Sequence, residues 1–222
     1  MKLRLLAPPS PHVATAALTL ALTLALVAAL AVPARAAEPS AADKTKLEAG
    51  EILIKAFQVP GSELPRAQVT AVIEAPMAKV WAVIEKCADY KRTMVRVLES
   101  EELSRAGSTV TCRTKVDMPW PFDDLEATTK ATHTVEPGKS YRRAWTLVKG
   151  TYTRNEGSWT LTPWAGSADR TLVVYEVHAE PTISIPVSIQ KRASRSALPD
   201  LIEKLRKVSG ARPAGQAGPG GH

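Results

Sequence analysis

Hydrophobic and polar residues alternate with a period of two over much of the chain. Such alternation is typical of antiparallel strands that bury one face and leave the other in water. The clearest alternating segments are 108–118, 125–136, 140–149, 154–163 and 170–180. Three shorter apolar segments, at 51–59, 67–75 and 94–103, predict further strands. The pattern therefore predicts an antiparallel sheet that occupies most of the chain.

The period changes to that of a helix at two places. In 76–90, residues that include Trp81 and Ile84 recur at helical spacing, which predicts a short amphipathic helix. In 186–208 an apolar stripe predicts a long helix, and Pro199 inside it should kink that helix. A single sheet has one face to bury, so the long helix is its expected cover. The predicted fold class is α+β.

The first 36 residues have the features of an export signal. Basic Lys2 and Arg4 precede an apolar run over 13–32, and the segment ends in the small-x-small sequence "ARA". We expect a signal peptide that is cleaved after Ala36, and hence a periplasmic or secreted protein. A retained membrane anchor is the alternative, because the apolar run is almost long enough to span a bilayer.

The rest of the chain divides by composition into one domain and two flanks. Residues 48–208 hold all of the predicted strands and helices, and their number suits one domain with its own core. Residues 37–47 are Ala-rich and polar, which predicts a flexible segment. Residues 209–222 are rich in Gly and Pro, which predicts a disordered tail.

Formal charge changes the picture only at the last predicted helix. The whole chain carries +7, and without the predicted leader it has 26 basic and 22 acidic residues, a net charge of +4. The last helix has six basic residues and two acidic ones, Asp200 and Glu203, and its net charge of +4 equals that of the whole chain without the leader. The six are Lys191, Arg192, Arg195, Lys204, Arg206 and Lys207. We expect them to approach an anionic membrane surface, with an ordinary solvated helix face as the alternative. Export argues against a nucleic-acid partner, and we expect a monomer.

Sequence motifs for metal, nucleophile or phosphate chemistry are missing. The four histidines, at positions 12, 133, 178 and 222, form no HxxxH pattern, and no CxxC occurs. The chain has no GxSxG motif and no Gly-rich phosphate loop. We therefore predict no metal, no cofactor and no assigned catalytic residue.

The two cysteines, Cys87 and Cys112, leave two alternatives open. An exported protein could pair them in a disulfide. A chain of this length does not need such a cross-link, and a buried cysteine usually behaves as a small hydrophobic residue.

Polar and aromatic residues at core-facing positions are the candidates for a ligand site. His133 and Arg143 fall on the inward side of their strands, where an arginine must be paired or reach water. Either both side chains line a cavity and orient the polar end of a ligand, or the inward side of the strand has been assigned one residue out of step. In the second case Arg143, like Arg142, faces the solvent. Leu198, on the stripe of the last helix, is a further candidate. The inward aromatic residues, which serve either as cavity wall or as core, are Trp145, Trp159 and Tyr175.

The segment "MPWPFDD", residues 118–124, places two large aromatic residues on a stiff loop. Its prolines exclude a central strand or a helix interior, and the aspartates that follow favour solvent. Trp120 and Phe122 therefore either pack back onto the domain or meet something apolar from outside. We expect this loop to lie at the mouth of a cavity and to form a gate together with the helix around Pro199.

Five short motifs resemble the START and polyketide-cyclase-like superfamily, which is also known as the helix-grip or SRPBCC superfamily. They are "LEAGEILIKAFQVPGSELPRAQVTAVIEAP", "VIEAPMAKVWAVIEKCADY", "MPWPFDD", "EGSWTLTPW" and "AEPTISIPVSI". The first is similar to the opening of exported bacterial members, and the likeness covers about 48–208. The resemblance implies a curved antiparallel sheet of about seven strands around a long C-terminal helix. It also implies a tunnel for lipids or other apolar molecules.

One feature departs from that superfamily. START domains commonly carry an arginine soon after the Pro-Trp-Pro loop, whereas here Phe122 is followed by "DDLE". Any ligand role of that arginine is therefore not carried over to this chain.

Taken together, these features predict an exported START-like domain that binds, or binds and transfers, a lipid or another hydrophobic small molecule. One alternative is a cyclase- or aromatase-type enzyme that uses the same cavity. Another is a ligand-free interaction module in which Trp120 and Phe122 anchor a protein partner. The fold alone does not identify the ligand.

Overall fold

The computed structural model describes residues 38–183 and 185–211, and for 187–195 it describes the backbone. Within these residues the strands are β1 (Leu53–Phe57), β2 (Arg66–Ile73), β3 (Val97–Ala106), β4 (Thr109–Val116), β5 (Leu125–Glu136), β6 (Ser140–Gly150), β7 (Tyr152–Pro163) and β8 (Thr171–Pro181). The helices are α1 (Ala41–Glu48), α2 (Met77–Ile84), α3 (Tyr90–Thr93) and α4 (Val187–Val208), with short 3₁₀ turns η1 (Cys87–Asp89) and η2 (Trp164–Gly166). The predicted signal peptide, residues 1–36, lies outside the described residues.

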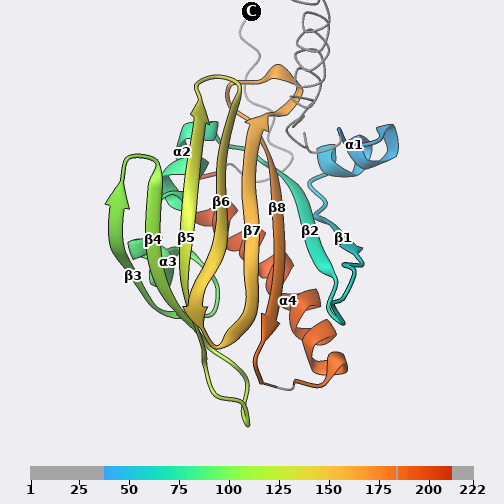
Figure 1. Cartoon of the computed structure of the whole chain (residues 1–222). Helices are drawn as coiled ribbons and strands as arrows, with labels where there is room; N and C mark the ends of the chain where they lie inside the picture. Colours follow the sequence, from blue (N-terminus) through green and yellow to red (C-terminus); the bar gives the residue numbers. More distant parts are fainter. Residues whose placement is uncertain (1–37, 184, 212–222) are drawn as a thin grey trace, which may run out of the picture. The chain divides into compact units, whose positions relative to one another are not determined.

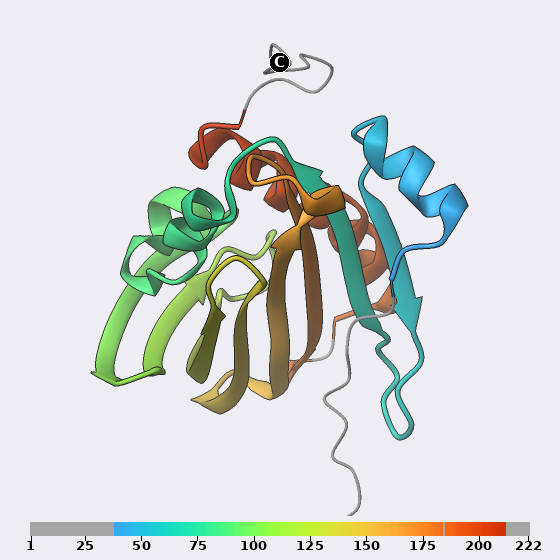
Figure 2. The same cartoon turned by 90° about the horizontal axis from the view of Figure 1, so that it is seen from above.

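All eight strands form one antiparallel sheet in the order β1-β2-β8-β7-β6-β5-β4-β3. Strands β3 to β8 are neighbours in chain order, whereas β2 pairs with β8, for example Thr70 with Val174. Figure 1 shows α4 crossing the sheet, and Figure 2 shows the sheet curving around α4. The predicted helix-grip fold is thus confirmed, with eight strands in place of about seven.

The main core lies between the sheet and the helices α2 and α4. On β2 the alternate residues Val69 and Ile73 are fully buried, and they pack with Ile84 of α2 and with Ile202 and Leu205 of α4. Full burial of one such aliphatic side chain contributes about 1.5–3 kcal/mol. We call this side of the sheet the inner face and the opposite side the outer face.

A short helix corrects the expectation of a flexible segment at 37–47. The Ser40 hydroxyl accepts a hydrogen bond from the backbone N–H of Asp43 (3.1 Å), which caps α1. Leu47 is almost completely buried against Val72 and Trp164 on the outer face. Because α1 buries just this one large apolar residue, its sequence shows no apolar stripe and looks like a linker.

Helix α4 runs without interruption from Val187 to Val208, although Pro199 lies inside it. The kink expected at this proline stays a prediction. Ser209, directly after the helix, is buried, and Ala211 packs against the main core. The predicted disordered tail is therefore wrong for 209–211, and residues 212–222 lie outside the described part.

Cys87 and Cys112 form a disulfide, which decides between the two alternatives that the sequence left open. The bond joins η1 to the middle of β4, and both cysteines are buried. It therefore fixes the connection between α2 and β3 on the inner face of the sheet. Among the helices of the described residues, none has the length and apolarity needed to cross a membrane.

Candidate functional site

Three aromatic side chains from adjacent strands gather on the inner face. Strand register places Trp159 of β7 opposite Tyr175 of β8, and their ring centroids are 4.2 Å apart. Tyr175 also stacks on Trp145 of β6, with centroids 5.9 Å apart and planes inclined by 22°. Trp159 is buried in the main core, whereas Trp145 and Tyr175 are partly buried at its edge. Trp145 donates its indole N–H to the side-chain oxygen of Asn155 (3.0 Å), so a polar group lies within this aromatic cluster.

Gly157 makes room for Trp145. A methyl group at position 157 would lie 2.6 Å and 2.7 Å from two atoms of the Trp145 ring, and 2.1 Å from the backbone oxygen of Glu176. The indole therefore lies over the backbone of β7, where any side chain would displace it. This explains the Gly-x-Trp spacing of the sequence, because Gly157 receives one tryptophan and Trp159 enters the core.

Arg143 lies on the inner face and is 3% exposed, whereas Arg142 is exposed on the outer face. The predicted inward orientation of Arg143 is thus right. Register places Arg143 opposite His133, and the Arg143 Nη1 lies 2.6 Å from the His133 Nε2. The Arg143 Nη2 donates to the Cys112 sulfur (3.3 Å), and its guanidinium carbon lies 5.8 Å from the centre of the Tyr90 ring. Every group in contact with this cation is uncharged.

His133 is neutral at physiological pH in this environment. Burial, together with the nearby charges of Arg143 and Arg105, lowers the pKa of His133 to about 4. An arginine has only donors, so the His133 Nε2 must accept, and the ring proton lies on Nδ1. The ring of Trp81 packs edge-on against His133, with centroids 5.1 Å apart. Burial also raises the pKa of Tyr90, whose hydroxyl donates to the backbone oxygen of Ile84 (2.5 Å).

No carboxylate neutralises Arg143. All Asp and Glu side chains of the sequence belong to the described part, and none of them lies within 4.0 Å of the Arg143 guanidinium. Glu102 of β3 is opposite Cys112, and the positive charge of Arg143 contributes to lowering the pKa of Glu102. Both oxygens of Glu102 instead accept from Arg105, at 2.8 Å and 2.7 Å, and this hydrogen bonding is the main cause that lowers the pKa of Glu102. The one carboxylate hydrogen-bonded within the cluster, Glu102, is thus bound by Arg105, on which the charge of Glu85 also acts from a greater distance.

The loop between β4 and β5 separates its two aromatic residues. Trp120 is 92% exposed, whereas Phe122 is partly buried. The Asp124 carboxylate accepts from the backbone N–H of Met118 (3.3 Å), which closes the base of the loop. Trp120 thus does not pack back onto the domain, and its contact with an apolar surface from outside stays a prediction.

The candidate residues of α4 lie in different environments. Leu198 is buried in the main core, where it packs together with Trp81 of α2. Arg206, predicted to meet a membrane, donates instead to the backbone oxygens of Gly50 and Val72, each at 3.0 Å, and thereby ties α4 to the sheet. Lys207 is exposed and Lys204 is partly exposed. The side chains of Lys191, Arg192 and Arg195 lie outside the described part.

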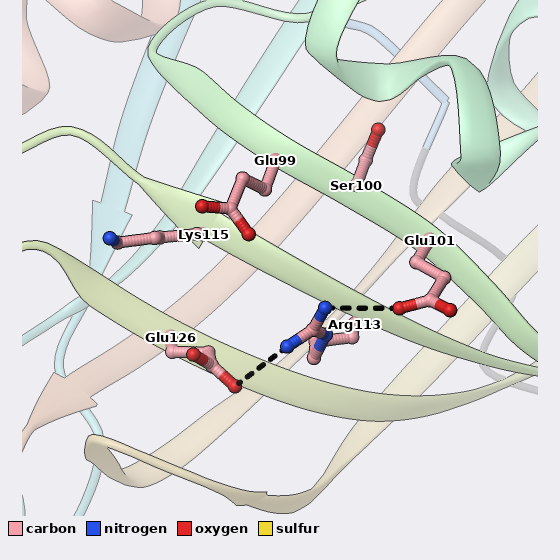
Figure 3. A pocket seen from close by; sticks show the side chains of 6 residues that line it. All are labelled: Glu99, Ser100, Glu101, Arg113, Lys115 and Glu126. Carbon is pink, nitrogen blue, oxygen red and sulfur yellow. Dashed lines mark hydrogen bonds and ion pairs between the residues drawn. The ribbon is translucent and has the colours of Figure 1, made fainter.

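A shallow pocket of about 230 Å³ lies on the outer face of β3, β4 and β5 (Figure 3). Its charged groups compensate one another: Arg113 pairs with Glu101 at 3.0 Å and with Glu126 at 4.0 Å. Glu99 stands opposite Lys115 in the strand register. Such paired charges are typical of a solvated strand surface, so this pocket is not the candidate site.

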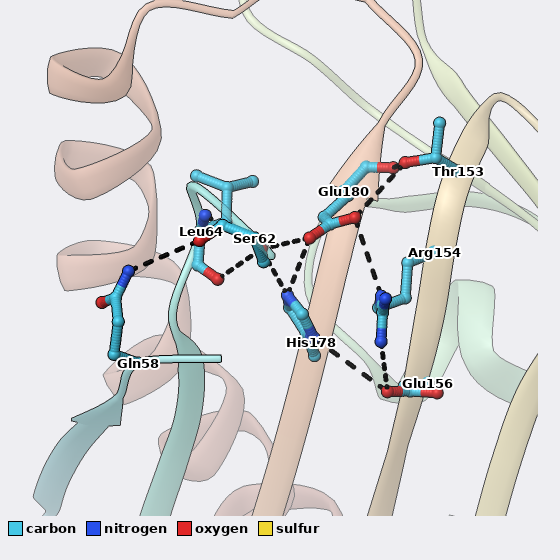
Figure 4. A network of polar contacts seen from close by, with 8 residues as sticks. All are labelled: Gln58, Ser62, Leu64, Thr153, Arg154, Glu156, His178 and Glu180. Atoms are coloured by element: carbon cyan, nitrogen blue, oxygen red, sulfur yellow. Dashed lines mark hydrogen bonds and ion pairs between the residues drawn. The ribbon is translucent and has the colours of Figure 1, made fainter. Parts of the chain in front are cut away.

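A second polar cluster, on the outer face of β7 and β8, contains a buried histidine (Figure 4). His178 Nε2 lies 3.0 Å from the Ser62 hydroxyl and 3.1 Å from Glu180, while Glu156 is 4.0 Å from Nδ1. The Ser62 hydroxyl contacts Glu180 and also accepts from the N–H of Leu64 (3.1 Å). It is therefore held within its own turn, and the cluster ties the β1–β2 turn to β8. Within residues 38–183 and 185–211, no group of His, Cys, Asp and Glu side chains could hold a metal ion.

Several residues that complete the inner-face site were not predicted from the sequence. Gly157 and Asn155 share the inward parity of Trp159 on β7, so the same alternation could have identified them. Tyr90 and Glu102 reach Arg143 and Cys112 from separate elements, and no local pattern in the sequence indicates those contacts.

Solved structures with the same fold include lipid-transfer and cyclase proteins. The chain is similar to the STAR-related lipid transfer protein from Xanthomonas axonopodis, with 22% identity, a TM-score of 0.63, and coverage of 71% of this chain and 93% of that one. Human STARD10 is 12% identical, with a TM-score of 0.62 and coverage of 80% and 82%. The Zhui aromatase/cyclase from Streptomyces sp. R1128 is 17% identical, with a TM-score of 0.51 and coverage of 68% and 98%. At these identities the likeness establishes the fold alone.

No curated protein matches the chain. A family model described as "Polyketide cyclase / dehydrase and lipid transport" matches residues 73–206, which is more than half of the chain. That match runs from the last residue of β2 almost to the end of α4 and thus includes both the aromatic cluster and the Arg143–His133 pair. The chain belongs to the polyketide cyclase, dehydrase and lipid transport family.

Proposed function

We propose that this domain binds a lipid or another hydrophobic small molecule between the inner face of the sheet and α4. The observation that carries the proposal is the Trp145–Tyr175 stack, whose two large rings face the core side and yet are only partly buried. Large aromatic side chains at such positions, together with the few polar groups of Asn155 and His133, have the composition of a small-molecule site. The family's description, which includes lipid transport, agrees with this proposal.

The gate of the proposed site is the β4–β5 loop, at the end of the sheet where α4 begins, and the part of the gate expected around Pro199 stays a prediction. Ala127 pairs with Gly150, and Tyr152 pairs with Pro181, so the β4–β5 loop, the β6–β7 turn and the start of α4 share one end of the sheet. Trp120 is at this end and presents an exposed ring to the solvent. Tryptophan favours the interface between water and lipid, so Trp120 would contact the bilayer while a ligand enters or leaves.

The proposed place of action is an exported compartment. The predicted signal peptide motivates this proposal, and the buried Cys87–Cys112 disulfide supports it, because disulfides persist in oxidising compartments. In such a compartment, a protein that shields an apolar molecule would carry it across the aqueous space between membranes.

Native mass spectrometry of the protein purified from its host's periplasm tests the binding proposal. We expect a co-purifying adduct of lipid size, identified by extraction, and we expect Trp145→Ala to reduce its occupancy severalfold. Thr146→Ala, on the same strand with its side chain exposed, is the matched control and should retain the adduct. A bare protein mass under gentle conditions, together with no uptake of any apolar probe, would contradict the proposal. A bound compound that is chemically altered over time would favour the cyclase alternative.

A further inference from the structure

Arg143 is a buried cation without a counter-ion, and its neighbours are neutral His133, the Cys112 sulfur and the Tyr90 ring. Burial of an isolated charge is costly, and buried charges in proteins are usually paired with an opposite charge. The His133 ring nitrogen and the weakly accepting Cys112 sulfur each take one of the five N–H donors of Arg143, and hydrogen bonding with Tyr90 also stabilises the cation. The site is therefore electrostatically incomplete and would be completed by an anion.

The surroundings of Arg143 sharpen this inference. Both oxygens of Glu102 are already bound by Arg105, so this carboxylate does not pair with Arg143. His133 adds a second donor: its Nε2 accepts from Arg143, so its Nδ1 carries the proton, and that N–H has no partner among the described side chains. His133 is only partly buried, so an incoming group would meet its ring before the guanidinium. A single negative charge with two or more acceptor oxygens matches these donors.

Aromatic and apolar side chains lie along the inner face of β6 between this cation and the proposed gate. Trp145 follows Arg143 by two positions on the same face of β6, which is about 7 Å along the strand. Leu147, also partly buried, comes next on that face, and the strand ends at Gly150 beside the gate. The distance along β6 from Arg143 to Gly150 is about 24 Å. A long apolar chain would lie along the Trp145–Tyr175 stack while its head group reaches Arg143.

We propose that the ligand is an amphiphile with one negative charge on its head group, and that it binds head first with that anion on Arg143 and His133. This inference rests on the proposed function, since it names the ligand class of the same site. A carboxylate and a phosphate ester share the required chemistry. Neutral lipids, which leave the guanidinium unpaired, would bind less tightly.

Matched probes that differ in head-group charge test this proposal on the delipidated full chain. Palmitate and palmitamide have the same tail, and hexadecyl phosphate represents the second anionic class. We expect palmitate to bind about tenfold to a hundredfold more tightly than palmitamide, as for a hydrogen bond to a charged partner. We expect Arg143→Gln to remove this difference, because palmitate should lose far more affinity than palmitamide. Arg142→Gln, an exposed change on the same strand, should preserve it. A phosphate preference over palmitate would identify the head group as phosphorylated.

NMR of palmitate labelled at its carboxyl carbon adds a readout that a structural role of Arg143 would not move. The pKa of the bound carboxyl should lie below that of palmitate in neutral micelles, and Arg143→Gln should raise it. Equal affinity of wild type for palmitate and palmitamide would overturn the proposal, even if the Arg143 variant fails to fold. Failure of all three probes to bind would instead overturn the proposed function itself.

Discussion

Gly157 shows how a single missing side chain shapes the inner face. Its position in the middle of β7 would normally weaken a strand, because glycine contributes no packing and gains much freedom on unfolding. Here the empty space is occupied by the Trp145 ring, which lies where a β-carbon substituent would project. The glycine is thus part of the proposed ligand site, although it has no side chain of its own.

Gly157→Ala is expected to destabilise the domain by about 2 kcal/mol, because the new methyl group would overlap the Trp145 ring and the Glu176 carbonyl oxygen. Urea denaturation measures the change. Combining Gly157→Ala with Trp145→Ala should recover part of the loss due to the ring but not the part due to the carbonyl. A Gly157→Ala variant as stable as wild type would show that the strand and the ring move apart freely.

His133 gives the stability of the domain a dependence on pH. Its pKa is about 4 in the folded protein and about 6.5 when unfolded. Between these values the unfolded chain binds more protons, so the free energy of unfolding should fall as pH decreases from about 6.5 to about 4. The maximal loss is about 3 kcal/mol, and partial exposure of the ring makes it smaller.

Comparison of urea midpoints at pH 7 and pH 5 for wild type and His133→Gln isolates this effect. The variant should lose less stability over that interval, because glutamine keeps the hydrogen-bonding capacity without titrating. The carboxylates with lowered pKa, such as Glu102 and Glu48, lose their contributions below the ordinary carboxyl range and thus mainly at lower pH. Identical pH slopes for the two proteins would show that His133 is not the group responsible.

At the scale of elements, the disulfide is a covalent long-range link on the inner face. It connects two cysteines 25 positions apart, so that the segment of η1 and α3 cannot leave β4. This segment carries Tyr90, one wall of the Arg143 cluster. The cross-link therefore stabilises the proposed head-group site as well as the fold.

Replacing both cysteines by serine should destabilise the domain by about 3.5 kcal/mol, the loop-entropy value for a closed loop of this size. Thermal melting with and without reducing agent measures the change. Reduced wild type should resemble the double variant, while oxidised wild type should melt at higher temperature. If reduction leaves the melting temperature unaltered, the bond contributes little to the native state.

The sequence predicts the strands well and the contacts between them poorly. Alternation over β4 to β8 is strong because one face is buried and one is wet, and it places Arg143, Trp145 and Tyr175 on the correct face. Helix α1 escapes notice because Leu47 is its one large buried side chain. The Arg143–His133 contact depends on register between β5 and β6, which neither strand specifies alone. The packing of Tyr90 beside Arg143 depends on tertiary structure in the same way.

At the scale of the whole molecule, the two faces of the sheet differ in the side chains that they carry. The outer face carries compensated charges around Arg113 and the buried cluster of His178, and α1 covers one end of it. The inner face holds the main core, the aromatic cluster and the uncompensated Arg143. The exposed ring of Trp120 lies at the end where the proposed ligand path opens.

Trp120→Ser is expected to slow transfer of a fluorescent lipid between vesicles severalfold while leaving the melting temperature unchanged, because the ring has almost no contacts to lose. Transfer rates in vesicles of anionic and neutral lipid measure the effect. Phe122→Ser, by contrast, should lower the melting temperature, since that ring is partly buried. A transfer rate that does not respond to Trp120 would place membrane contact elsewhere on the domain.

The order of the strands also determines when the domain can complete its folding. Strand β2 can pair only after β8 is available, about 100 residues later in the chain. Its buried residues can complete their packing only when Ile202 and Leu205 of α4 dock. Pairings between such distant segments form slowly, because loop closure costs entropy before contacts compensate it. A newly made chain therefore exposes the apolar face of a nearly finished sheet until its last helix docks. During this interval the intermediate is vulnerable to aggregation and proteolysis, so its survival depends on how fast α4 arrives.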